Sequence, residues 1–429
     1  KNTGQGVQTV QVDMAQHCAS LGIECHSVAT LPELLEAAVH VRIATKDVAV
    51  PDTTRYAALL SPSVTAQVQA LAARVERAAA DPQAARLGTQ PKAQVEAQMQ
   101  GARDELKKAQ DALAAQHYYA SATESFKGSI AVGRAENLTR YYAAPAAGRE
   151  AVVADAVDTC AAAAQQAQAL VQGLKPDHLN ALYAVGAAQD RAQEAGVLLS
   201  QARAQHDQGL WGDSLASSAF CAERARTVTW WAGLRDLFPE GPAVPDLAGT
   251  AQAELDQASD LVSYAQAVLQ NQATDAQARL GQAAAQAAAG NLPAAILAAA
   301  DAQSLASVAM QTGGGGAPVP ASVLAAAQQG AARAIARAQA GGAEPMLSVS
   351  MVELAQGQDQ GPVSLQEYWS ARNLALLQLA PAGQEAPVTH LPFSSYGGGT
   401  VLAFLGSGLV VGLAASGLVV VALMARRPR

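Results

Sequence analysis

Most of the chain carries apolar residues at helical spacing. Val64, Val68 and Leu71 recur every three or four positions, which is the pattern of an amphipathic helix over 61–81. Similar patterns, several bounded by proline, predict helices over 91–116, 117–141, 145–173, 178–207, 212–237, 247–272, 274–289, 293–311, 321–340 and 365–379. These segments predict a mainly α-helical body of hairpins and bundles.

The first 48 residues have a different pattern. Alternating apolar residues at 6–12 and 23–28 predict two strands, while 13–21 and 31–39 predict two short helices. A fragment of this size buries too little surface to fold alone. We therefore expect it to form the edge of a larger α/β domain. A further strand-like run is expected over 346–352.

One local pattern occurs three times. Gln116, Gly209 and Gly290 are each followed two positions later by a bulky residue and three positions after that by a small one. The bulky residue can close a turn, and the small residue permits close antiparallel packing. The intervals are more than twice the roughly 34 residues of a tetratricopeptide repeat. The pattern therefore predicts recurring helical hairpins and not a regular solenoid.

The strongest hydropathy signal lies near the C-terminus. Residues 400–424 form an uncharged segment, long enough as a helix to cross a hydrocarbon core of about 30 Å. Arg426, Arg427 and Arg429 follow, and basic residues tend to remain in the cytoplasm. We expect a single-pass anchor in the lipid of the cell membrane, with the bulk of the chain outside the cell.

The expected membrane helix carries small residues at Gly408, Gly412 and Ser416. This spacing permits close contact between two such helices, although glycine is also simply tolerated in membrane helices. Lys1 is followed by polar residues, so no secretory signal is visible. Because an exterior domain needs an export signal, we expect residue 1 not to be the first residue of the gene. Asn137 begins an N-glycosylation sequon, which fits an exterior location.

Composition narrows the classes of function. Charged residues make up 15% of the chain, against roughly 25% in typical soluble domains, and the net charge is −8. Basic residues cluster only at the C-terminus, so we expect no nucleic-acid partner. The sequence has no glycine-rich phosphate-binding motif, and we expect no cofactor.

The predicted organisation has seven parts. They are an α/β edge (1–48), a helical ectodomain (49–312), a glycine-rich joint (313–319), a second helical segment (320–380), a juxtamembrane linker (381–399), the membrane helix (400–424) and a basic tail (425–429).

Several strings resemble a known peptidase family. Lys1–Gln5, Val12–Ala15, Leu21–Val28 and Thr30–Ala37 resemble the closing segment of a Lon-type serine peptidase domain. Tyr118–Ala122, Cys221–Trp231 and Gln366–Trp369 are similar to strings in the helical region of archaeal membrane-anchored Lon-like peptidases. The resemblance implies a Ser-Lys dyad upstream of Lys1, so no catalytic residue can be assigned within this chain.

The resemblance implies that the chain anchors and scaffolds an extracytoplasmic Lon-like peptidase. Its expected partners are an upstream peptidase fragment or further copies of itself. The alternative is a non-catalytic surface or envelope protein that keeps a vestigial peptidase edge. Whether the chain belongs to an active enzyme therefore stays open.

Cysteines and aromatic residues supply the remaining candidate chemistry. Cys18 with Cys25, and Cys160 with Cys221, could form disulfides outside the cell, or all four could be buried thiols. The neighbouring His17 and His26 would complete a set of metal ligands, but adjacent residues point in different directions, so we expect no metal.

Two further sets of residues have a functional and a structural interpretation. Lys127 lies near two serines, Ser125 and Ser129, although a solvated lysine is the simpler interpretation. Trp230 and Trp231 could form a binding surface or pack in a core.

Overall fold

The computed structural model describes residues 14–22, 51–238, 241–244, 246–269, 272–314, 318–357 and 361–377. These residues belong to two compact units, one containing residues 14–22 and the other residues 51–377. The first unit contributes one described helix, α1 (Met14–Ser20), close to the predicted 13–21. The strands expected at 6–12 and 23–28, the helix at 31–39 and the membrane segment at 400–424 lie outside the described residues.

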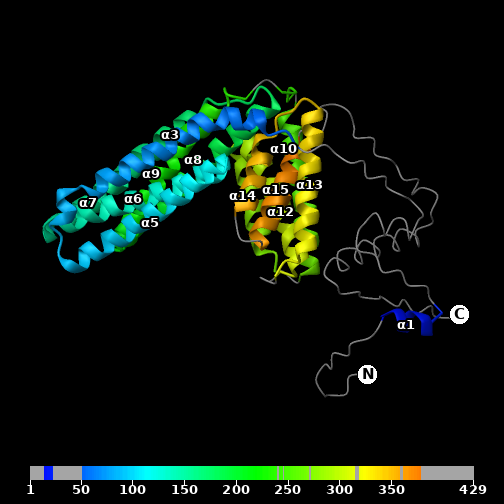
Figure 1. Ribbon diagram of the computed structural model, residues 1–429, viewed down its shortest axis with the longest axis horizontal. Helices are drawn as coiled ribbons and strands as arrows, with labels where there is room; N and C mark the ends of the chain where they lie inside the picture. Colours follow the sequence, from blue (N-terminus) through cyan, green and yellow to red (C-terminus); the bar gives the residue numbers. More distant parts are fainter. Residues whose placement is uncertain are drawn as a thin grey trace, which may run out of the picture. The chain divides into compact units, whose positions relative to one another are not determined.

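The described part of the larger unit is helical (Figure 1). Its helices are α3 (Thr54–Ala79), α4 (Pro82–Ala85), α5 (Thr89–Ala114), α6 (Tyr118–Ala143), α7 (Arg149–Gln172), α8 (Leu179–Asp207), α9 (Trp211–Leu234), α10 (Leu247–Val268), α11 (Thr274–Ala288), α12 (Leu292–Thr312), α13 (Ala321–Ala340), α14 (Met346–Gly357) and α15 (Pro362–Leu377). A short 3₁₀ turn, Ala146–Gly148, precedes α7.

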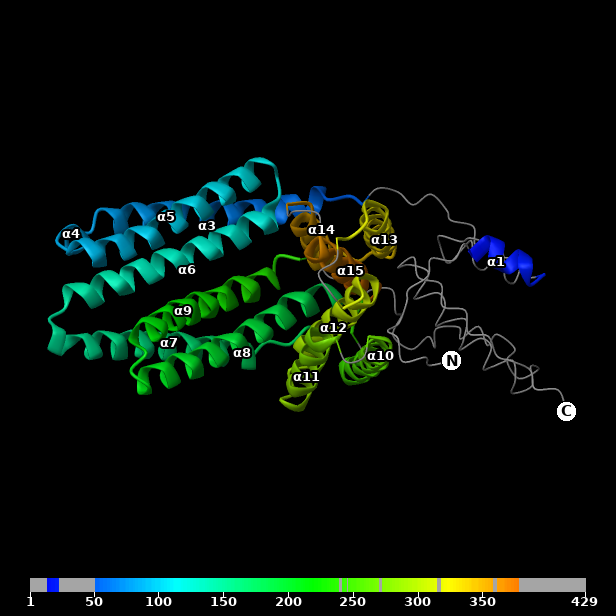
Figure 2. The same cartoon turned by 90° about the horizontal axis from the view of Figure 1, so that it is seen from below.

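The helices of this unit form two groups, which we call the first group (α3 to α9) and the second group (α10 to α15) (Figure 2). In the first group, α3, α5 and α6 pack together, as do α7, α8 and α9, and α6 contacts α9. In the second group, α10 to α12 and α13 to α15 form two such sets, joined by α12 and α15. The two groups meet where α8 contacts α12 and where α14 contacts α6.

The main core lies across this junction. Tyr56, Leu182 and Tyr183 of the first group share one buried cluster with Ile296 and Met346 of the second. Away from the junction, the fully buried residues of the α10–α12 set are alanines and Val262, with partly buried leucines packed against them. Alanine's small side chain lets helices approach closely, so the alanine-rich composition of the sequence has a direct packing role.

Two sequence predictions need correction. The strand-like run over 346–352 is the start of α14, because every residue from Met346 to Ser350 is buried and a helix supplies backbone partners inside the core. The predicted helix start at residue 61 was too late, because α3 begins at Thr54 and contains Pro62 in its interior. Tyr56 and Leu60, each 1% exposed, pack in the main core, and this packing explains how the first turns of α3 are held.

Among the described residues, α12 is the one helix that is long and apolar enough to span a membrane. Two-thirds of its apolar window is buried by neighbouring helices. That burial is what a core helix also shows, so α12 by itself does not place the chain in a membrane.

Candidate functional site

A cavity of about 840 Å³ lies at the junction of the two groups. It is lined from the first group by α3, α6, α8 and α9, and from the second group by α11, α12, α14 and α15. Its volume falls within the roughly 300–1,000 Å³ typical of ligand pockets. Because so many separate helices contribute, only the tertiary fold brings this site together.

Aromatic side chains are concentrated in the cavity wall. The whole chain holds five Phe and four Trp, and two of each line this cavity, namely Phe126, Phe220, Trp230 and Trp231. The indole rings of Trp230 and Trp231 lie edge to face with centroids 4.9 Å apart. Tyr119 packs against Trp231 at 5.9 Å. Trp231 is buried in the core, and both Trp residues line the cavity.

Three arginines from different helices form an ion-pair network in the wall. Arg191 Nη1 donates to Glu194 Oε1 at 2.8 Å, one turn further along α8. Arg279 Nε of α11 donates to Asp301 Oδ2 of α12 at 2.8 Å, and its two terminal nitrogens lie 3.3 and 3.4 Å from the Asp190 carboxylate. This network links α8, α11 and α12 beside the cavity.

Arg224 of α9 is the least compensated of these cations. Its Nε lies 2.9 Å from Glu194 Oε2, but it has no hydrogen-bond partner among the described residues. Its guanidinium carbon lies 4.4 and 5.4 Å from the ring centroids of Phe126 and Phe220. Burial, followed by repulsion from Arg191, lowers the pKa of Arg224 to about 10. A guanidinium that is 16% exposed and ion-paired with one carboxylate can accept a further anion.

Glu367 of α15 is the complementary group in the second helix group. It lines the cavity, and no described cation lies within ion-pair distance of its carboxylate. Burial, and then the charge of Asp301, raises the pKa of Glu367 to about 7. A cation or a hydrogen-bond donor in the cavity would relieve this unfavourable burial.

Three segments of this chain resemble strings in the helical region of Lon-like peptidases. Residues from all three line this one cavity. Tyr119 and Ala122 come from the first string, Arg224 and Trp231 from the second, and Glu367 from the third. They lie on α6, α9 and α15, far apart in the sequence.

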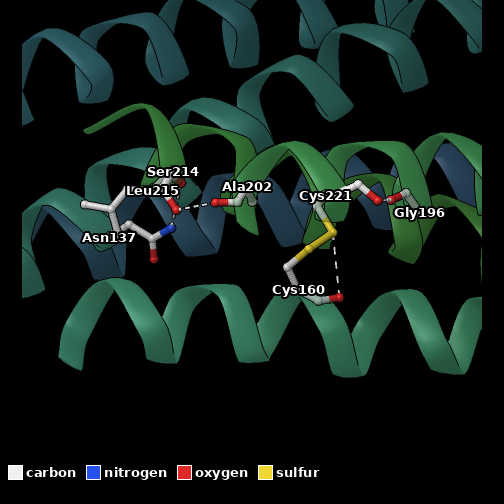
Figure 3. Close-up of a disulfide and its surroundings, with 8 residues drawn as sticks. Asn137, Cys160, Gly196, Ala202, Ser214, Leu215 and Cys221 are labelled. Carbon is white, nitrogen blue, oxygen red and sulfur yellow. Dashed lines mark hydrogen bonds between the residues drawn. A yellow bond between two sulfur atoms is a disulfide. The ribbon is translucent and has the colours of Figure 1, made fainter. Parts of the chain in front are cut away.

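The structure joins Cys160 on α7 to Cys221 on α9 by a disulfide, with Cα atoms 5.6 Å apart (Figure 3). Cys18 is also disulfide-bonded, and Cys25 lies outside the described residues. No described group of three or more His, Cys, Asp or Glu residues is placed to hold a metal ion. Lys127 is exposed and pairs with Glu124 at 2.8 Å.

Asn137, the expected glycosylation position, is 9% exposed. Its Nδ2 donates to the Leu215 carbonyl at 3.2 Å (Figure 3). Its Oδ1 accepts from Arg140 at 2.8 Å. The amide nitrogen of the sequon is therefore used in a hydrogen bond inside the fold. The sequon triplet carries no information about burial.

The residues predicted for the membrane helix contact and the cytoplasmic tail lie outside the described residues. They are Gly408, Gly412, Ser416, Arg426, Arg427 and Arg429.

Sequence reasoning missed Asp190, Arg191, Arg279 and Asp301 as members of a site. One signal was available: Asp190 and Arg191 end a run of twelve residues on α8 that the structure buries almost completely. A charged pair at the end of so apolar a stretch indicates partners in the interior. Asp301 carried the same signal, because it is the one charged residue in the apolar helix α12. Arg279 gave no such signal, because it lies among polar and small residues on α11.

No protein-family model, curated protein or solved structure matches the chain. The site must therefore be interpreted from its own geometry and chemistry.

Proposed function

We propose that the helical body is a binding module for a small organic ligand, held in the cavity between the two helix groups. The observation that carries this proposal is the composition of the cavity wall. Aromatic rings, aliphatic side chains and an incompletely paired arginine converge there from separate helices. Pockets lined mainly by apolar groups with a few oriented polar groups are typical of ligand sites.

We also propose the context in which this module works. The chain would anchor and scaffold an extracytoplasmic Lon-like peptidase, with residues 400–424 as the membrane anchor. Two observations support it: the Cys160–Cys221 disulfide suits an oxidising compartment, and three strings that resemble the peptidases' helical region line one cavity. Labelling of material purified from native membranes with a serine-reactive probe tests for the peptidase partner; a non-catalytic surface protein would leave no labelled companion.

Filling the cavity tests the binding function. Ala122 and Ala187 line it from α6 and α8, so Ala122→Phe with Ala187→Phe should occupy part of the space. We expect the full-length chain in lipid nanodiscs to bind the neutral dye Nile red, and the double variant to bind it at least tenfold more weakly. Dye binding is measured by fluorescence, with protein-free nanodiscs as the baseline.

The matched control places the same two rings on the surface. Ala143 of α6 and Ala162 of α7 are exposed, so Ala143→Phe with Ala162→Phe should keep the affinity of the unmodified chain. Circular dichroism confirms that each variant remains helical. Equal affinities of the filled and control variants would show that the dye does not use this cavity, and the binding function would have to be abandoned.

A further inference from the structure

Two charged groups of opposite sign face the cavity from different helix groups. Arg224 belongs to α9 of the first group and Glu367 to α15 of the second. The carboxylate that pairs with Arg224 is that of Glu194, and Arg191 pairs with it as well. The Tyr119 hydroxyl interacts electrostatically with Arg191, Glu367 and Arg224. Other charged residues of the lining, such as Arg74, Lys127 and Arg226, are hydrogen-bonded to carboxylates, so Arg224 and Glu367 are the groups of the lining that a charged ligand would pair with.

Part of the cavity wall is apolar. Leu297 of α12, Leu347 and Met351 of α14 and Leu374 of α15 line it together with the Trp pair. A ligand that spans both charged sites must therefore also present apolar surface. Ser125 Oγ of α6, which is buried in the lining without a hydrogen-bond partner, adds one further polar contact point.

Charge complementarity separates the possible ligand classes. A simple organic anion would satisfy Arg224 but would add negative charge near Glu367 and Asp301. An organic cation would have the opposite conflict with Arg191 and Arg224. A neutral molecule would leave Glu367 without a partner and Arg224 with the Glu194 carboxylate alone, which is costly away from water.

On the basis of the proposed binding function, we infer that the cavity takes a zwitterionic molecule with an apolar body. Its carboxylate lies at Arg224, its ammonium group lies at Glu367, and its body lies along the leucine, methionine and tryptophan side chains. A short unblocked peptide with apolar side chains has this chemistry and suits a cavity of about 840 Å³. The guanidinium fork matches a carboxylate, and both contacts are charge-assisted hydrogen bonds.

Blocking each end of one peptide tests the two contacts separately. The probes are trileucine, its N-acetyl form, its C-terminal amide and the doubly blocked form, titrated by calorimetry into the full-length chain in nanodiscs. We expect trileucine to bind most tightly. Removing either terminal charge should weaken binding about tenfold or more, since each charge-assisted hydrogen bond has that magnitude.

Variants assign each end of the peptide to its residue. In Arg224→Met, the peptide with a free carboxylate and its C-terminal amide should bind with equal affinity. The peptide with a free amine should still bind more tightly than its N-acetyl form. Glu367→Gln should show the reverse. Exposed changes of the same kind, Arg203→Met on α8 and Glu150→Gln on α7, should keep both differences.

The unmodified chain alone can overturn the inference, so the test does not depend on any variant folding. Equal binding of doubly blocked and unblocked trileucine would refute the zwitterion assignment. Nile red binding that no trileucine form displaces would refute it as well. In both cases the cavity still binds an apolar molecule, and the proposed function stands. Loss of Nile red binding to the cavity would refute the proposed function itself.

Discussion

At the scale of single residues, the Glu353 carboxylate is a central contact of the junction. Its Oε2 accepts hydrogen bonds from the Tyr56 hydroxyl of α3 at 3.0 Å and from the Tyr119 N–H of α6 at 2.8 Å. The Tyr56 hydroxyl also lies 3.2 Å from Ser350 Oγ. Burial raises the pKa of Glu353 to about 7, although these hydrogen bonds act in the opposite direction. The folded protein therefore favours the protonated form.

This raised pKa predicts a pH-dependent stability. In the unfolded chain the carboxyl ionises near 4.5. Its stabilising contribution is therefore complete below that pH and is lost as the pH rises through about 7. In the unmodified chain, titration of Glu353 should lower the free energy of unfolding by on the order of 3 kcal/mol between pH 5 and pH 8. Glu353→Gln stays neutral over this range, so we expect this decrease to be absent from the variant. Urea denaturation followed by circular dichroism measures it.

The control for this prediction is Asp260→Asn, an exposed change on α10. It should keep the pH profile of the unmodified chain. If the stability difference between Glu353→Gln and the unmodified chain is the same at pH 5 and pH 8, the Glu353 carboxyl does not titrate as we describe.

At the scale of elements, the three repeated patterns form the same hairpin turn. Gln116, Gly209 and Gly290 all have left-handed backbones, with φ of 62°, 72° and 78°. The next residue in each case donates its N–H to the carbonyl five positions earlier, as in the Schellman motif. The turns connect α5 to α6, α8 to α9 and α11 to α12. The repeated sequence pattern therefore corresponds to one repeated way of ending a helix.

The small residue of each pattern marks where the two helices touch. Ser121 Oγ donates to the Ala109 carbonyl at 2.7 Å. Ser214 Oγ donates to the Ala202 carbonyl at 2.9 Å, as Figure 3 shows. Both pairs are twelve residues apart. The alanine twelve residues before the third small residue, Ala283, has no exposed surface, and neither do Ala109 and Ala202. A larger side chain at these positions would separate the helices.

One of the three turns uses a residue that is unfavourable for its backbone. A side chain in the left-handed region costs roughly 1 kcal/mol, which glycine avoids. We therefore expect Gln116→Gly to raise the free energy of unfolding by about 0.5–1 kcal/mol. Gly209→Ala should lower it by about 1 kcal/mol, although its Cβ would meet no atom within 4 Å. Thermal unfolding measures both changes.

A nearby glycine provides the comparison. Gly212 is exposed within α9, and an added Cβ would meet no atom within 4 Å. Because its backbone is helical, Gly212→Ala should stabilise the chain, opposite in sign to Gly209→Ala. The same sign for both alanine substitutions would be inconsistent with a backbone origin.

At the scale of the whole helical body, the close approach of α8 to α12 holds the two groups together. A Cβ on Gly186 of α8 would lie 2.7 Å from Leu297 Cδ1 and 2.8 Å from the Pro293 carbonyl oxygen of α12. Leu297 also lines the cavity. The absence of a side chain at Gly186 therefore sets the distance between the groups beside the site.

We expect Gly186→Ala to lower the free energy of unfolding by about 1–3 kcal/mol, because a backbone oxygen cannot move aside as a side chain can. It should also weaken Nile red binding, since α12 would shift at the cavity wall. Gly196→Ala on the same helix meets no atom within 4 Å and should be neutral or stabilising. Urea denaturation compares the two variants, and equal effects would show that the α8–α12 contact is not the cause.

The sequence by itself determined most of the helices and three of their turns. Apolar spacing and helix-ending residues are local signals, so α13 appears over the predicted 321–340 and the Gln116, Gly209 and Gly290 turns occur as expected. The local signals failed at 346–352, where burial on several sides replaces a single apolar stripe, and at the start of α3, which lies seven residues before the predicted residue 61.

Only the tertiary structure decided which residues line the site and which of the polar candidate residues are buried. The cavity joins residues from eight helices, and nothing in the local spacing of Arg224 or Glu367 indicates that they share one space. Burial likewise places Asn137, the expected glycosylation position, in the interior. The physical reason is that helix formation depends on neighbours a few positions away, whereas desolvation and charge pairing depend on residues that folding brings together from distant parts of the chain.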